Sequence, residues 1–148
     1  MKTNHLLLLF VALIFLGTST TMITVPDSVL TKIANAIALA EGYFVANSRA
    51  KSNYNPGDLT LDLTGKSIGK DGMYVQYANE HDGFEALKRQ IALMYSGSRI
   101  YKPSMTIMDV ATRYAPPANA QDTQHINWAT IVARSLGVTI NTRLNEIT

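Results

Sequence analysis

An acidic residue ends an apolar run near the start of the chain, and its position there is chemically unusual. Glu41 follows the stretch IALA and directly precedes Gly42. At about 100° per residue, the four steps from Ile37 to Glu41 leave a rotation of only about 40°, so Glu41 continues the apolar face of a predicted helix. Burial and the partial negative charge at a helix C-terminus both favour the neutral carboxylic acid and raise its pKa. A carboxyl group that stays protonated near neutral pH suits general-acid chemistry, such as protonation of a glycosidic oxygen.

Glycoside hydrolysis usually requires a second carboxylate, and the sequence offers two candidates downstream of Glu41. Asp58 belongs to the turn sequence NPGD, and Asp62 alternates with Leu61 and Leu63, which predicts the polar face of a short strand. Either carboxylate could orient a water molecule. The competing interpretation is that both are ordinary solvated residues of a hairpin.

Glu41 also has purely structural interpretations. It could form a buried ion pair with one of the cations Arg49, Lys51 and Arg89, and structural ion pairs perturb pKa values as active sites do. It could also be a residue of a frayed last turn that points into water. The spacing alone leaves these alternatives open.

The elements that position these residues are mostly helical. Residues 27–42 form a predicted helix that begins at Asp27 and stops at Gly42. Residues 44–57 are predicted as loop, and residues 58–63 and 73–77 as two strands of an antiparallel hairpin. The sequence therefore predicts a mainly α (α+β) domain with one small antiparallel β-hairpin.

Three further helices are predicted after the hairpin. The first begins with a capping-box pattern at Asp82 and Glu85, and the second with one at Thr106 and Asp109. The third runs from about residue 123 to 136 and closes at Gly137. We place a single domain at residues 27–145.

The composition excludes several classes of protein. The chain has 148 residues, 47% of them apolar, and a net charge of +2 without a dense basic run, so nucleic-acid binding is not expected. Cysteine is absent and the three histidines are far apart, which predicts neither a disulfide nor a metal site. We expect no cofactor.

The first residues indicate export. Lys2 precedes an apolar block over residues 6–16, and small residues follow up to residue 20. This is the pattern of a secretory signal peptide over residues 1–20, although the block is too short to span a bilayer comfortably. We expect a secreted or periplasmic protein, with an uncleaved membrane anchor as the alternative.

Several segments together resemble a known superfamily. AEGYFVANSRAKSNYNPGDL is similar to a segment of bacterial and phage lysozyme-like proteins, the peptidoglycan-cleaving muramidases and lytic transglycosylases. HDGFEALKRQIALM and MTIMDVATRYAPPANAQDTQHINWATIVARSLGV resemble their later helices, so the resemblance covers about residues 30–144. The chain departs from the pattern at Tyr54, where asparagine is usual.

The resemblance implies a lysozyme-like fold and a glycosidase that cleaves the β-1,4 bond between N-acetylmuramic acid and N-acetylglucosamine. Glu41 would be the general acid and then the general base, while Asn55, Asp58 and Tyr114 would contact the substrate. The partner would be a peptidoglycan glycan strand, with membrane contact only through an uncleaved leader, and we expect a monomer. Tyr114 also lies on an apolar helix face, so a structural role remains open for it.

Two questions stay open from the sequence. The resemblance does not separate a hydrolase from a lytic transglycosylase, in which the substrate's own 6-hydroxyl attacks and leaves an anhydro product. The alternative function is a non-catalytic glycan-binding or assembly module with a lysozyme-like fold. The absence of an evident second carboxylate and the departure at Tyr54 favour that alternative.

Overall fold

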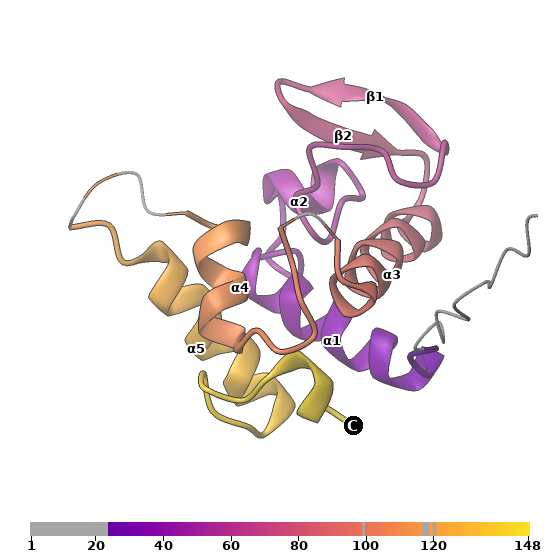
Figure 1. Cartoon of the computed structure of the whole chain (residues 1–148). Helices are drawn as coiled ribbons and strands as arrows, with labels where there is room; N and C mark the ends of the chain where they lie inside the picture. The colour runs from indigo at the N-terminus through magenta and orange to yellow at the C-terminus, as the bar shows by residue number, and fades with distance from the viewer. Residues whose placement is uncertain (1–23, 99, 117–118, 120) are drawn as a thin grey trace, which may run out of the picture.

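The computed structural model describes residues 24–98, 100–116, 119 and 121–148 (Figure 1). The predicted signal peptide at residues 1–20 lies outside the described residues. The elements are, in chain order, α1 (Asp27–Ala40), α2 (Arg49–Ser52), β1 (Ser67–Asp71), β2 (Tyr74–Tyr77), α3 (Glu80–Ser96), α4 (Ile107–Tyr114), α5 (Gln124–Leu136) and the 3-10 helix η1 (Leu144–Glu146). The prediction of a mainly α chain with one small antiparallel hairpin is confirmed for this part of the chain.

Helix α1 lies at the centre of the main core. It packs against both α3 and α5, and α5 in turn packs against α4 (Figure 1). Its buried face includes several alanines, whose small side chains let neighbouring helices approach closely. The residues of this face are Val29, Ile33, Ala34, Ala36, Ile37 and Ala38. The prediction that this helix has an apolar inner face is thus confirmed, and Leu30 is half-buried beside it.

The hairpin lies apart from this core, above α2 in Figure 1. Its strands β1 and β2 pair antiparallel, and Asp71 faces Tyr74 across the turn. The predicted second strand agrees with β2, but the prediction of a first strand at residues 58–63 is wrong. The strand that pairs with β2 lies later, in the stretch that was expected to be a connection.

The side chain of Asp62 explains why that stretch is irregular. Its carboxylate accepts hydrogen bonds from the backbone N–H groups of Thr64, Gly65 and Ser67, each at 3.0 Å. A local side-chain acceptor of this kind competes with the hydrogen bonds of a strand and bends the chain. The alternating leucines are therefore not on one face: Leu59 is buried, whereas Leu61 is exposed.

The start of α4 and the end of α5 lie where the sequence predicts them, because their capping residues are adjacent in sequence to the helix ends. Thr106 and Asp109 form the predicted capping box of α4, and Gly137 ends α5 with a φ of 71°. The predicted start of α3 is wrong by a few residues, because Asn79 is its N-cap and accepts a hydrogen bond from the backbone N–H of Asp82. The short helix α2, within the predicted loop, was missed.

Candidate functional site

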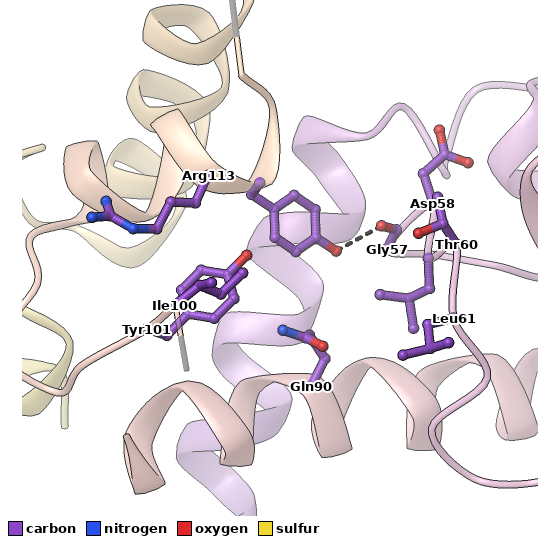
Figure 2. A pocket seen from close by; sticks show the side chains of 10 residues that line it. Gly57, Asp58, Thr60, Leu61, Gln90, Ile100, Tyr101 and Arg113 are labelled. Atoms are coloured by element: carbon purple, nitrogen blue, oxygen red, sulfur yellow. Dashed lines mark hydrogen bonds between the residues drawn. The ribbon is translucent and has the colours of Figure 1, made fainter. Parts of the chain in front are cut away.

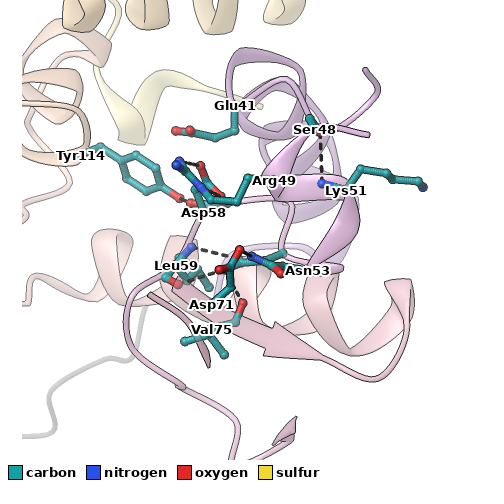
Figure 3. Close-up of polar contacts among 12 residues, drawn as sticks. Glu41, Ser48, Arg49, Lys51, Asn53, Asp58, Leu59, Asp71, Val75 and Tyr114 are labelled. Carbon is teal, nitrogen blue, oxygen red and sulfur yellow. Dashed lines mark hydrogen bonds and ion pairs between the residues drawn. The ribbon is translucent and has the colours of Figure 1, made fainter. Parts of the chain in front are cut away.

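Glu41 lies at the C-terminal end of α1, where the chain turns away from the helix. Its backbone N–H still donates to the carbonyl of Ile37, at 2.9 Å, and Gly42 follows with a φ of 70°. A positive φ favours glycine, so the sequence Glu-Gly ends the helix directly after the acid. The Glu41 side chain consequently stays on the inner side of the helix and points toward Tyr114 (Figure 3).

The carboxyl group of Glu41 is bonded to a distant tryptophan. Trp128, on α5, donates a hydrogen bond from its indole Nε1 to Oε1 of Glu41 at 2.7 Å. Trp128 is buried in the main core. Its second role was missed, although a buried indole N–H generally requires an acceptor and offers a signal for such a contact.

Burial raises the pKa of Glu41 to about 7. The hydrogen bond from Trp128 opposes this rise, the negative charge of Asp58 adds to it, and the positive charge of Arg49 lowers the pKa again. The prediction of a raised pKa is therefore confirmed, although the residue as a whole is half-buried. At neutral pH the group is present in both its protonated and its ionised form, as acid–base catalysis requires.

Asp58 lies beside this acid but is engaged by an arginine. Its two carboxylate oxygens accept from Nη2 of Arg49 at 2.5 Å and from Nε at 3.4 Å. The same guanidinium group lies over the ring of Tyr74, 3.6 Å from its centroid. Arg49 therefore ties α2 to the turn, as Figure 3 shows, and through Tyr74 also to the hairpin.

Glu41 does not form the ion pair with Arg49 or Lys51 that its structural interpretation would require. Arg49 pairs with Asp58, and Lys51 pairs with Glu80 at 3.7 Å. Two of the three candidate cations thus have other carboxylate partners. The alternative in which Glu41 points freely into water is also wrong, because the group is largely buried and bonded to Trp128.

The side chain of Asn55 lies inside the turn and bonds to backbone atoms there. Its Nδ2 donates to the carbonyls of Leu59 and Val75, and its Oδ1 accepts from the Leu59 N–H, all at 2.9 Å. The side chain is fully buried. The expected substrate contact through Asn55 stays a prediction, while in this structure its amide fixes the loop that presents Asp58.

Tyr114 connects the turn to the tryptophan. Its hydroxyl donates to the carbonyl of Gly57 at 2.6 Å, and its ring lies 5.0 Å from that of Trp128 at an interplanar angle of 30°. Gly57 fits closely here, since a Cβ at this position would lie 2.7 Å from the Tyr114 hydroxyl. The structure thus brings Glu41, Asp58 and Tyr114 into one cluster, which we call the Glu41 cluster together with Arg49 and Trp128.

A pocket of about 270 Å³ adjoins the Glu41 cluster (Figure 2). Its size is near the lower end of the range for small-molecule sites, so it fits one compact group of a larger ligand. Asp58 and Tyr114 belong both to its wall and to the cluster. The residues that line it are Gly57, Asp58, Leu59, Thr60, Leu61, Gln90, Ile100, Tyr101, Arg113 and Tyr114.

The other carboxylate candidate, Asp62, serves the loop. Hydrogen bonds from backbone N–H groups and from the Thr64 hydroxyl hold the pKa of Asp62 below its usual value. Within the described ranges, no three histidine, cysteine or acidic side chains gather as a metal site would require. Over the same residues, no helix is both long and apolar enough to cross a membrane.

Comparison of the chain with protein-family models, with curated proteins and with solved structures found no match. The resemblance to the lysozyme-like superfamily therefore stays a prediction.

Proposed function

We propose that the protein is an exported peptidoglycan-cleaving glycosidase that acts on the β-1,4 bond between N-acetylmuramic acid and N-acetylglucosamine. The observation that supports this most is the Glu41 carboxyl, with a pKa of about 7, which Trp128 holds in one cluster with Asp58 and Tyr114 of the pocket wall. A positioned acid whose pKa lies near the working pH is the group that protonates a leaving glycosidic oxygen. Export would depend on residues 1–20.

Glu41 acts twice in the proposed reaction. Its protonated form first gives the proton to the glycosidic oxygen, and the C1–O bond breaks as an oxocarbenium-like centre develops. The carboxylate then takes a proton from the nucleophile that bonds to C1, which returns Glu41 to its starting state. The negative charge of Asp58 acts electrostatically on Glu41 and would also favour the positive transition state.

Asp58 and Asp62 already have other partners, which favours a route in which Glu41 is the single acid. Asp62 is bound by its own loop, and Asp58 is held by Arg49. A lytic transglycosylase needs no second base, because the substrate's 6-hydroxyl attacks C1 and gives its proton to Glu41. The product is then a 1,6-anhydro sugar. Hydrolysis, with water in place of that hydroxyl, is the competing route.

A second candidate function is a non-catalytic module that grips glycan strands or serves an assembly. The same engagement of Asp58 and Asp62 favours it, because hydrolysing glycosidases usually use two available carboxylates. Under this function the raised pKa of Glu41 would be only a consequence of its burial.

Release of soluble fragments from purified cell walls separates the two functions. We expect Glu41→Gln to abolish release, since the amide keeps the shape but cannot give a proton. Glu80→Gln is the matched control, because Glu80 is exposed and pairs with Lys51, and we expect it to retain activity. Equal release by Glu41→Gln and the unmodified chain would contradict the proposal. Wall binding without any cleavage by the unmodified chain would favour the non-catalytic module.

A further inference from the structure

The pocket beside the Glu41 cluster continues into a second hollow. The two share Ile100 and Arg113, and the second is also lined by Lys102, Met105, Thr112 and Pro116. We call the two together the Arg113 groove. It begins at the wall formed by Asp58 and Tyr114, where α4 ends, and extends past Thr112 and Arg113 in the last turn of that helix. Figure 2 shows its first half.

The far half of the Arg113 groove carries two positive charges, of which that of Arg113 also acts electrostatically on the nearby Asp109. Lys102 and Arg113 are both exposed, and neither belongs to an ion pair formed within the described part of the chain. Arg113 donates from Nη1 to the backbone carbonyl of Asp109 at 2.8 Å, which orients its guanidinium. The Asp109 carboxylate itself is held by Thr106 in the capping box.

The near half offers groups suited to an amide. Gln90 points from α3 into the pocket, and Tyr101 lies across from it (Figure 2). A carboxamide both donates and accepts, so it complements a peptide or acetamido group. A guanidinium group complements a carboxylate. The one acid among the described lining residues, Asp58, is already paired with Arg49.

We propose that the Arg113 groove binds the acidic peptide stem that branches from the glycan strand, with Arg113 and Lys102 facing the stem's carboxylates. A neutral sugar would leave both cations without a counter-charge, whereas a short chain of amides and carboxylates matches the order of groups along the groove. The inference rests on the proposed function, because it takes the ligand to be peptidoglycan. It adds that the chain recognises the stem as well as the sugars.

A binding measurement in the Glu41→Gln background tests this without cleavage. The probes are a disaccharide of N-acetylglucosamine and N-acetylmuramic acid with its peptide stem, and the same disaccharide after the stem has been removed. We expect the stem-bearing probe to bind about fivefold more tightly by titration calorimetry, the ratio expected of partly exposed ion pairs. We also expect that preference to weaken at high salt.

Charge-removing variants supply the control. Adding Lys102→Gln and Arg113→Gln should bring the two probes within about twofold of each other, whereas Lys32→Gln with Arg134→Gln, which removes two charges outside the groove, should keep the preference. Equal affinity for both probes in the Glu41→Gln chain would overturn the inference. So would binding of neither probe, or a preference that survives loss of both groove cations.

The failure of this inference can be told from failure of the proposed function. Wall cleavage by the unmodified chain with equal binding of the two probes would overturn the role of the groove alone. A stem preference in a chain that cleaves no wall material would support the groove and overturn the catalytic proposal alone.

Discussion

Trp128 donates a hydrogen bond from its indole Nε1 to Oε1 of Glu41, 87 positions away in the sequence. The contact joins the middle of α5 to the end of α1, so the packing of the core also fixes the orientation of the acid. Trp128 stacks on Tyr114, and Tyr114 is bonded to the carbonyl of Gly57. One chain of contacts thus runs from the acid to the turn that carries Asp58.

Replacing Trp128 by phenylalanine tests this contact. Phenylalanine keeps an aromatic ring against Tyr114 but removes the N–H donor that stabilises the ionised form of Glu41. We therefore expect the pKa of Glu41 in Trp128→Phe to rise above its value of about 7. NMR titration of the labelled glutamate carboxyls measures it, and an unchanged or lower pKa would show that the indole does not act on this acid.

The pair formed by Arg49 and Asp58 should shift the same pKa in opposite directions. Asp58→Asn removes a negative charge that raises the pKa of Glu41, so the pKa should fall. Arg49→Gln removes a positive charge and leaves Asp58 unpaired, so the pKa should rise. In the pH profile of wall cleavage, the alkaline limb reports loss of the acid's proton and should move down in the first variant and up in the second. If the alkaline limb moved in the same direction in both variants, this assignment would be refuted.

The raised pKa of Glu41 also predicts how stability changes with pH. The folded-state pKa of about 7 lies above the ordinary value of 4.5, so between these values the folded chain holds a proton that the unfolded chain has released. The contribution of Glu41 is thus fully present below about pH 4.5 and is lost as pH rises through about 7. The loss is on the order of 3 kcal/mol.

Urea unfolding of the Glu41→Gln variant isolates this effect. A glutamine does not titrate, so the free energy of unfolding should fall less between pH 5 and pH 8 in the variant than in the unmodified chain. Glu80→Gln should keep the original slope. If Glu41→Gln had the same pH dependence as the unmodified chain, the carboxyl would not be buried as the structure shows.

Asn55 is predicted to matter for stability and not for ligand contact. Asn55→Ala removes the side-chain partners of the Leu59 N–H and of two buried carbonyls, which should cost about 3 kcal/mol or more in the free energy of unfolding. Asp58→Asn, at a partly exposed side chain, should cost about 1 kcal/mol or less. Thermal and urea unfolding measure both. An Asn55→Ala chain of unchanged stability with weakened glycan binding would instead support the direct contact expected from the sequence.

Local patterns predicted the elements that depend on nearby residues. The period of the apolar residues before Glu41 gave the buried face of α1, and Gly42 gave its end, because both follow from helical geometry alone. The capping box at Thr106 and Asp109 was equally readable. The first strand failed because the hydrogen bonds of the Asp62 carboxylate outweighed an alternating pattern that is typical of strands.

The partners within the site could not be read from such patterns. Trp128 reaches Glu41 only because α5 packs on α1, and nothing in the local sequence specifies that pairing. Arg49 was a candidate partner of Glu41 by proximity in sequence, but the turn carries Asp58 to it instead. Choosing between these partners required the tertiary structure.

Mass spectrometry of a cell-wall digest tests whether Glu41 is the acid that cleaves the glycan. We expect soluble muropeptides with 1,6-anhydro ends from the unmodified chain and from Glu80→Gln, and none from a folded Glu41→Gln chain. Reducing ends in place of anhydro ends would keep the acid and replace the transglycosylase route by hydrolysis. The same products from Glu41→Gln as from the unmodified chain would contradict the claim.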